Sequence, residues 1–441
     1  MNRSTKLALA VALALGVTAC GQKEEPKKAD AAPAAPAGVT VTIAHAGPLT
    51  GSIAHLGKDD ENGVALAIAQ ANGQKLTLDG KPVTFRMMSE DDQADPKTGT
   101  TVAQKLVDAK VAAVIGHLNS GVTIPASEIY TKAGIPVISG SATNPTLTER
   151  GLKGVFRTVG RDDQQGPAIA AFIATELKAK KVAIIDDKTA YGEGLANEVE
   201  KYLKGKKVAI VGRERTTDKE TDFKAILTKI KAKNPDVVFH GGMDATGGPM
   251  LKQARELGIK SAFSFGDGAC TNEMAKLAGA AAEGLICSQA GLPAEAASAD
   301  FKNAFKAKYG DIKQYAPYFY DATLTVIEAM KKAGSADPAK FTPEMYNVSF
   351  TGATGKVEFD AKGDRKDAEI TIFRLQDGNI KPLAVVKNGV STPFAAPAAP
   401  AAAPAASGAP MPPAAPTAAP AAGATEAAKK VEEPKKKKGG C

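Results

Sequence analysis

Two loops in the middle of the chain carry hydroxyl groups that could bind a small anion. The first contains Ser120 and follows the apolar run 111–116, and the second contains Thr143 and follows the apolar run 135–139. Hydroxyl groups, and the free N–H groups at the start of a helix, donate hydrogen bonds to a carboxylate. We therefore expect Ser120 and Thr143 to bind the carboxylate of a small ligand. Another interpretation stays open on spacing alone: Ser120 only caps a helix and Thr143 only begins a turn.

The segments around these loops predict a parallel α/β sheet. Both apolar runs are short and continuous, which is typical of strands covered on both faces. Between them, residues 123–133 are expected to form a helix with Ser120 at its N-cap. Ligands of open α/β sheets bind beyond the carboxyl ends of the strands, where both loops lie. Further strand–helix units extend the pattern over residues 39–291, too many for one sheet, so two lobes are expected.

The composition of the 441 residues is that of a soluble globular protein, with 44% hydrophobic and 24% charged residues. The formal net charge of +8 raises the question of a nucleic-acid partner. The lysines, however, are spread over the body and clustered at the C-terminal end, with no aromatic side chains interleaved. Because base-binding surfaces combine both residue types, we expect a solvated basic tail and no nucleic-acid partner.

The N-terminal residues 1–19 have the pattern of an export signal, which is excluded from the fold. A positive end and an apolar core lead to the sequence VTAC, which resembles a bacterial lipobox. The lipobox implies that Cys20 is the lipidated first residue of the mature protein, with acyl chains enough for stable attachment. A signal peptide cut nearby is the alternative. We expect residues 20–38 to form a flexible tether and residues 395–441, rich in Ala, Pro and Lys, to be disordered.

The remaining cysteines permit a disulfide but predict no metal site. Cys270 follows one expected strand and Cys287 lies on the next, so the two could be bonded in an exported protein. Cys441 is a leftover thiol on the tail. Neither the cysteines nor the four histidines have the spacing of a metal site, so we expect neither a metal nor a cofactor.

The motifs of common enzyme classes are missing from the sequence. It contains no GxxxxGK[ST], no strand-coupled GxGxxG, no GxSxG elbow and no HExxH. His117 lies three residues before Ser120, but a nucleophile and its base normally need a third group that orients the base. We therefore do not expect an enzyme.

Five collinear segments resemble the leucine/isoleucine/valine-binding protein family, the type I periplasmic substrate-binding proteins of ABC transporters. The segments are IGHLNSGVTIPASEIY, GIPVISGSATNPTLTERG, FRTVGRDDQQGP, VAIIDDKTAYGEGLA and TDFKAILTKIKAKNPDVVFHGG. The resemblance implies an α/β protein of two Rossmann-like lobes (periplasmic binding protein type I), joined by three crossover strands, with the ligand cleft between the lobes. It places residues 39–162 plus 290–366 in an N-terminal lobe and residues 163–289 plus 367–394 in a C-terminal lobe.

The resemblance also implies the contacts of a bound amino acid. Ser120 and Thr143 match positions that hold the ligand α-carboxylate, while the Ser141 carbonyl and the Thr143 hydroxyl match acceptors for its ammonium. Asp267 matches an acidic residue that binds the ammonium from the second lobe, and Tyr191 an aromatic residue that covers the ligand. The following residues match side-chain pocket positions: Leu56, Leu118, Ala142 and Tyr315. Without the resemblance, Asp267 between two glycines would be read as a turn residue.

The chain departs from the leucine-binding members at several site positions. Those members have Glu where this chain has Asp267, so the lobes would close further or water would bridge the ammonium contact. Asn119 stands at the position of a disulfide cysteine whose partner is replaced by Ala94, and Met243 stands at the position of an aromatic residue. Met can fill an apolar gap, which keeps a branched-chain ligand reasonable. Asn119 and Asp244 could instead admit a polar or larger amino acid.

Together these features predict a lipid-anchored receptor in the periplasm. It would capture leucine, isoleucine or valine by lobe closure, act as a monomer and deliver the ligand to the membrane permease of an ABC transporter. Cys20 would attach it to the inner or the outer membrane. The alternatives are a receptor for a polar amino acid or another small carboxylate, a sensor ectodomain of the same fold, and an envelope-interaction protein acting through its tail.

Overall fold

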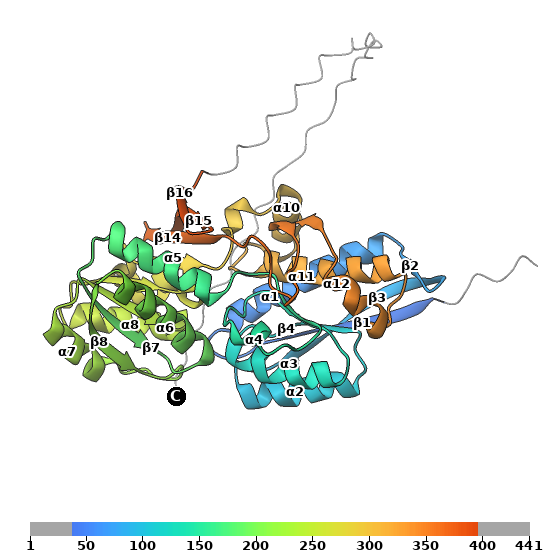
Figure 1. The fold of residues 1–441 in the computed structure, drawn as a ribbon, viewed down its shortest axis with the longest axis horizontal. Helices are drawn as coiled ribbons and strands as arrows, with labels where there is room; N and C mark the ends of the chain where they lie inside the picture. The colour runs from blue at the N-terminus through green and yellow to red at the C-terminus, as the bar shows by residue number, and fades with distance from the viewer. Residues whose placement is uncertain (1–37, 396–441) are drawn as a thin grey trace, which may run out of the picture. The chain divides into compact units, whose positions relative to one another are not determined.

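Two mixed β-sheets organise residues 38–395, the part of the chain that the computed structural model describes (Figure 1). The six-stranded sheet has the order β2-β3-β1-β4-β5-β6, and the eight-stranded sheet has the order β16-β15-β14-β11-β10-β9-β7-β8. We call the six-stranded sheet and the helices packed on it lobe 1, and the eight-stranded sheet and its helices lobe 2. The fold class predicted from the sequence, a two-lobed α/β protein, is confirmed.

Lobe 1 combines the first third of the chain with helices from its last third. Its strands are β1 (Val39–Gly47), β2 (Thr77–Leu78), β3 (Lys81–Asp91), β4 (Ala113–Gly116), β5 (Val137–Ser139) and β6 (Val155–Arg157). Its helices are α1 (Ala54–Gly73), α2 (Pro96–Asp108), α3 (Ser120–Lys132), α4 (Thr146–Glu149), α10 (Ala299–Tyr309), α11 (Ala316–Ala333) and α12 (Pro338–Met345). A small separate sheet pairs β12 (Phe350–Gly352) with β13 (Gly355–Val357).

Lobe 2 takes the middle of the chain and the last described strands. Its strands are β7 (Lys181–Asp186), β8 (Ala209–Arg215), β9 (Val237–Gly241), β10 (Ala262–Phe265), β11 (Ile286–Gln289), β14 (Ile370–Gln376), β15 (Asn379–Lys387) and β16 (Val390–Pro393). Its helices are α5 (Asp162–Thr175), α6 (Ala190–Gly205), α7 (Lys224–Lys233), α8 (Asp244–Glu256) and α9 (Glu273–Ala278). The structure also describes three short 3-10 helices: η1 (Asp267–Ala269), η2 (Gly279–Ala282) and η3 (Ala294–Ala296).

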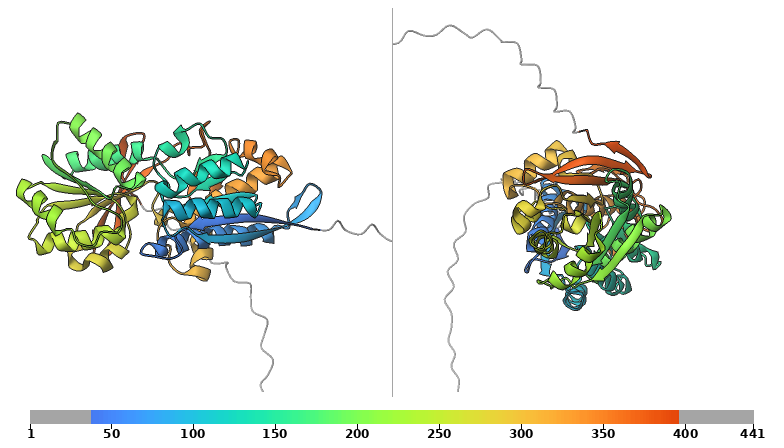
Figure 2. Two further views of the ribbon diagram at one scale, coloured as in Figure 1. Left: turned by 90° about the horizontal axis from the view of Figure 1, so that it is seen from below. Right: turned by 90° about the vertical axis from the view of Figure 1, so that its left-hand side faces the viewer.

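The strand sequences explain why the sheets are covered on both sides. Every residue of β4 is buried, as in a parallel strand with helices on both faces. In lobe 1, α1 and α11 pack together, as do α2 and α3, and the apolar residues form separate clusters on the two faces of the sheet. Figure 2 shows helices on both faces of the sheets. Local signals begin some helices: the Asp95 side chain caps α2, and the Thr189 side chain caps α6.

The chain passes between the two sheets three times: after β6, after β11 and after β13. The residue limits that the sequence suggested for the lobes stay predictions.

One local prediction is wrong, because α3 begins at Ser120 and the residue before it, Asn119, is the N-cap. Asn and Ser are equally favoured at N-caps, so composition could not separate the two positions.

Several predictions concern residues outside those described. They are the signal segment 1–19, most of the tether 20–38, the lipidated Cys20, and the tail 395–441 with Cys441, of which the structure describes Ala395 and residue 38 only. Among residues 38–395, no helix combines the length and the hydrophobicity needed to cross a bilayer.

Candidate functional site

A small cavity lies where the two lobes meet, and both lobes line it. Its wall consists of Leu118, Asn119, Ser120, Ser141 and Tyr315 from lobe 1, and Tyr191, Met243, Asp267 and Gly268 from lobe 2. The sequence predicted every one of these residues except Gly268. A Cβ at Gly268 would lie 2.5 Å from the Met243 Sδ, so only glycine fits between Met243 and Tyr191 without displacement. The GDG sequence around Asp267 was the available signal for it.

Three predicted site residues lie outside the cavity wall. Leu56 and Ala142 are buried among the apolar residues of lobe 1. Thr143 is also fully buried, and its hydroxyl has no hydrogen-bond partner among the described residues. Its backbone carbonyl accepts from the N–H of Asp162 at 3.0 Å, so Thr143 lies where the two lobes meet. Thr143 therefore belongs to the same loop as the cavity residue Ser141 but does not line the cavity.

The lobe 1 side of the cavity consists of the two loops that follow β4 and β5. The Ser120 Oγ accepts a hydrogen bond from the Asn144 N–H at 3.2 Å, which leaves the Ser120 hydroxyl proton free to donate. Ser141 Oγ donates to the Leu118 carbonyl at 2.9 Å. These contacts tie the two loops to each other. Lobe 1 thus presents a rigid, uncharged surface with a spare hydroxyl donor.

Arg157 holds the loop that follows β5 in place. Its fully buried guanidinium donates to the carbonyls of Ala142 at 2.7 Å and Asn144 at 3.0 Å, and to the Asp364 carboxylate at 2.6 Å. Burial acts to raise the pKa of Asp364, but the positive charges of Arg157 and Arg161 outweigh it and lower that pKa. The ion pair therefore stays charged inside the protein and holds the loop in place.

The lobe 2 side of the cavity presents a carboxylate. Asp267 begins η1, directly after β10, and is fully buried. Its Oδ1 accepts from the Tyr191 hydroxyl at 2.8 Å and from the Gln165 amide at 3.0 Å, and its Oδ2 accepts from the Tyr315 hydroxyl at 2.7 Å. Burial raises the pKa of Asp267, while these three donors act in the opposite direction. Oxygen lone pairs remain on this carboxylate for a further donor, such as an ammonium group.

A disulfide fixes the segment that carries Asp267. Cys270, just after η1, is bonded to Cys287 on the neighbouring strand β11, with an S–S distance of 2.07 Å. The pairing that the sequence allowed is therefore present in the structure. It ties the end of the Asp267 turn to the sheet.

Among residues 38–395, side chains of lobe 1 donate four hydrogen bonds across the cleft to lobe 2. Tyr315 reaches the Asp267 carboxylate, and the Gln314 amide reaches the Asp267 carbonyl at 2.7 Å. The other two join Asn144 Nδ2 to the Ala190 carbonyl at 2.6 Å, and His55 Nε2 to Asp244 Oδ2 at 2.9 Å. The lobes are thus closed on each other. Sequence reasoning missed Gln165, Gln314 and His55, because no local pattern marks them.

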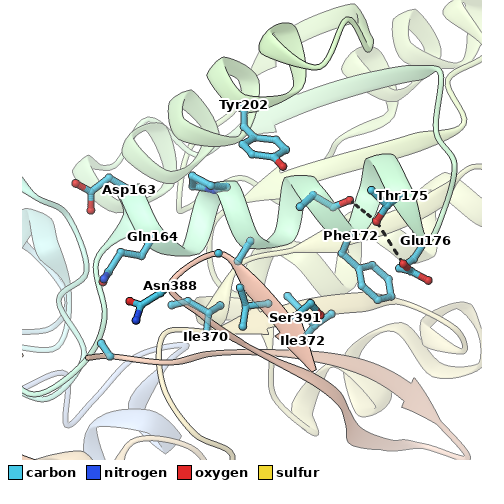
Figure 3. A pocket seen from close by; sticks show the side chains of 16 residues that line it. Asp163, Gln164, Phe172, Thr175, Glu176, Tyr202, Ile370, Ile372, Asn388 and Ser391 are labelled. Carbon is cyan, nitrogen blue, oxygen red and sulfur yellow. Dashed lines mark hydrogen bonds between the residues drawn. The ribbon is translucent and has the colours of Figure 1, made fainter. Parts of the chain in front are cut away.

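A larger hollow, of about 300 Å³, lies away from the cleft, between α5 and the strands β14 to β16 (Figure 3). Phe172, Tyr202, Ile370 and Ile372 contribute apolar surface, and Asp163 and Glu176 contribute acidic groups. Both walls belong to lobe 2, so movement of the lobes would not enclose a ligand there. None of the residues predicted to bind the ligand lines it, and we take the cleft as the candidate site.

The geometry around Ser120 is not that of a nucleophile and its base. His117 Nδ1 contacts Asp92 Oδ2 at 2.7 Å, and His117 Nε2 contacts the Tyr130 hydroxyl at 3.0 Å. Both ring nitrogens of this buried histidine are therefore engaged with partners other than Ser120. The cleft has the arrangement of a two-lobed binding protein that encloses a small ligand between a hydroxyl surface and a carboxylate.

Comparisons with known proteins agree with this class. The model of the periplasmic binding protein family matches residues 40–379, and the chain belongs to this family. A Leu/Ile/Val-binding protein homolog from Brucella abortus is 38% identical over 333 residues, which are 75% of this chain and 89% of the relative. A leucine-, isoleucine-, valine-, threonine- and alanine-binding protein from Pseudomonas aeruginosa is 37% identical over 342 residues, 76% of this chain and 89% of the relative.

Solved structures show the same likeness. The branched-chain amino acid transporter substrate-binding protein from Streptococcus pneumoniae, in complex with isoleucine, has a TM-score of 0.72 and 29% sequence identity. The match covers 79% of this chain and 100% of that one. The resemblance to the leucine/isoleucine/valine-binding protein family that the sequence indicated is confirmed.

Proposed function

We propose that this protein is the substrate-binding component of an ABC transporter and captures a branched-chain amino acid by closing its lobes around it. The observation that carries the proposal is the pairing, in one cavity, of the free Ser120 hydroxyl from lobe 1 with the Asp267 carboxylate from lobe 2. A zwitterion has an acceptor at one end and a donor at the other, so each lobe suits one end. The names of the relatives from Brucella abortus and Pseudomonas aeruginosa support this ligand class.

The two-sided site gives binding a mechanical consequence. A ligand held at one end by each lobe binds the closed form more tightly than the open form, so it shifts the population toward closure. Hydrogen bonds to charged groups contribute roughly 1.5–3 kcal/mol each, and a micromolar ligand needs about 8 kcal/mol in total. A few such bonds together with burial in the cavity are enough. A permease can then recognise the closed, loaded form.

Calorimetry of the ligand-free protein with each of the twenty amino acids tests the proposal. We expect leucine, isoleucine or valine to bind tightly, and Thr143→Ala and Asp267→Ala to abolish or severely weaken that binding. Tyr202→Ala, which alters lobe 2 away from the cleft, is the control and should retain binding. If no amino acid binds the unaltered protein, the proposal is wrong.

A polar amino acid is the second candidate ligand, and Asn119 favours it. Asn119 lines the cavity, and its side-chain Oδ1 is buried with no hydrogen-bond partner among the described residues. A hydroxyl-bearing ligand side chain could donate to it, whereas a purely apolar one would leave it unpaired. Tighter binding of threonine than of valine, reversed by Asn119→Leu, would identify this second specificity.

We further propose that a lipid on Cys20 attaches the protein to a cell-envelope membrane and that it acts there as a monomer. The lipobox-like sequence VTAC supports attachment. Cys20→Ser should move the protein from the membrane fraction to the soluble periplasmic fraction. Light scattering of the released protein should give the mass of one chain.

A further inference from the structure

His55 and Asp244 meet across the mouth of the cleft, although 189 positions separate them in the sequence. His55 lies in the first turn of α1 in lobe 1, and Asp244 is the first residue of α8 in lobe 2. Their Nε2 and Oδ2 atoms are 2.9 Å apart, and because a carboxylate only accepts, the imidazole donates. Asp244 is next to Met243, which lines the ligand cavity. The contact therefore joins the two lobes beside the cavity.

The carboxylate of Asp244 is held in position but not satisfied. Its Oδ2 also accepts from the Thr271 hydroxyl at 2.6 Å, and Thr271 follows the disulfide residue Cys270. Its Oδ1 is buried and has no partner among the described residues. A charged donor stabilises a fully buried carboxylate with an unpaired oxygen more than a neutral donor does. The Asp244 side chain has no exposed area, whereas 23% of the His55 side chain is exposed, so solvent protons can reach the histidine.

The groups that face His55 are acidic. They are Asp244 on α8, Glu273 on α9 and Asp59 on α1 itself. Partial burial acts to lower the pKa of His55, but the hydrogen bond and the negative charge of Asp244 outweigh it and raise that pKa, with smaller contributions from Glu273 and Asp59. Asp244 and Glu273 belong to lobe 2, so opening of the cleft removes them from His55 and leaves only Asp59. The imidazolium is therefore stabilised in the closed form more than in the open form.

We propose that His55 and Asp244 form a pH-sensitive clasp that holds the lobes closed when His55 is protonated, so that the protein binds its ligand more tightly in mildly acidic than in alkaline medium. The inference rests on the proposed function, because it concerns the closure that encloses the ligand. A group whose pKa is raised in the closed form stabilises that form relative to the open form. This stabilisation is complete below the open-form pKa, which is about 6.5 for histidine. The stabilisation is lost as the pH rises through the closed-form pKa.

Other titrating groups can be separated from this effect. Burial lowers the pKa values of His45 and His240 to about 4, so both stay neutral between pH 5.5 and 8. Asp187, whose pKa burial raises to about 6, titrates in that range but lies in lobe 2, after β7. A His55→Gln variant keeps these groups and removes only the proposed proton site. The difference between the two proteins therefore isolates the clasp.

The test measures L-leucine affinity by calorimetry at pH 5.5, 6.5, 7.5 and 8.5 for the unaltered protein, His55→Gln and Asp244→Asn. We expect the Kd of the unaltered protein to be about 5- to 10-fold lower at pH 5.5 than at pH 8.5, and both variants to vary less than about twofold. Lys58→Gln, which removes an exposed charge from the same helix, should keep the pH dependence. A dependence that is absent from the unaltered protein, or that persists in His55→Gln, would overturn the clasp.

Scattering of the ligand-free protein separates this inference from the proposed function. The radius of gyration should decrease from pH 8.5 to pH 5.5 in the unaltered protein and stay constant in His55→Gln, because protonation alone favours closure. If leucine does not bind at any pH while this change occurs, the amino-acid proposal fails and the clasp stands. If leucine binds but neither affinity nor radius depends on His55, the clasp fails and the proposal stands.

Discussion

The two lobes use opposite chemistry at the cleft that they share. Lobe 1 supplies donors: the free Ser120 hydroxyl, and the side chains of Tyr315, Gln314 and His55 that reach across. Lobe 2 supplies acceptors, chiefly the Asp267 carboxylate. The difference teaches that lobe closure and ligand recognition use the same complementarity. On the proposed function, the lobes attract each other in the way that each would attract one end of a zwitterion.

Substitution of Asp267 should have the largest effect on ligand affinity, because this residue is the main acceptor of lobe 2. Asp267→Ala removes the only anion that lines the cavity in the described structure. It also leaves the buried hydroxyl donors of Tyr191 and Tyr315 without an acceptor. We expect ligand affinity to fall about 300-fold, or about 3.4 kcal/mol. Calorimetry measures it, and Asp267→Asn, which keeps the shape, separates the charge from the packing. An affinity within tenfold of the unaltered protein would contradict the ammonium contact.

The disulfide between Cys270 and Cys287 tests how far the acceptor lobe depends on a covalent cross-link. Replacing both Cys270 and Cys287 by Ala opens a cross-link with a sequence separation of 17 and should lower the free energy of unfolding by about 3 kcal/mol. Urea denaturation measures the loss, and the unaltered protein under reducing conditions is the control. We also expect weaker ligand binding, because the turn that carries Asp267 loses its tie to β11. Unchanged stability would show that packing alone holds the turn.

On the proposed function, substitution of Ser120 should lower the ligand affinity by less than substitution of Asp267. Ser120→Ala removes one hydroxyl donor from lobe 1, while the backbone N–H groups at the start of α3 remain available to a carboxylate. We expect about a tenfold loss of affinity, close to 1.4 kcal/mol, measured by calorimetry. Ser120→Thr, which keeps the hydroxyl, should retain more of the affinity than the alanine variant. Equal losses in the two variants would assign the effect to packing.

The hollow in lobe 2 should have the smallest effect. Tyr202→Ala alters the wall of this hollow (Figure 3). It leaves both sides of the cleft intact. Ligand affinity should therefore change less than twofold. A larger change would mean that this hollow is coupled to the cleft. Ligand affinity would then depend on a third region besides the two sides of the cleft.

Much of the fold could be predicted from the sequence because its elements carry strong local patterns. Helix α10, for example, has clear local signals at both ends, since Ser298 caps it and Gly310 ends it. The last elements were missed for a physical reason. Most residues of β15 and β16 are exposed or only partly buried, so the sequence shows no clear apolar face. Helix α12 is eight residues long and contains Pro343, which weakens the helical signal.

The site could be predicted in part only. Ser120 and Thr143 follow strands, and the strand pattern alone brings their loops together. Asp267 needed the resemblance, because an aspartate between glycines is common in turns. The contact between His55 and Asp244 could not have been predicted, since it joins residues 189 positions apart and exists only when the two lobes are closed.

Arg157 has a consequence for the size of ligand that this protein can hold. Fixing one residue of backbone costs about 1–2 kcal/mol of conformational entropy. The buried guanidinium imposes that order on the loop from Ala142 to Asn144 when the chain folds, before any ligand arrives. The contacts of the ligand therefore do not have to offset the entropy cost of ordering this loop. On the proposed function, a molecule as small as a single amino acid, with few atoms to contribute, would therefore still bind tightly to lobe 1.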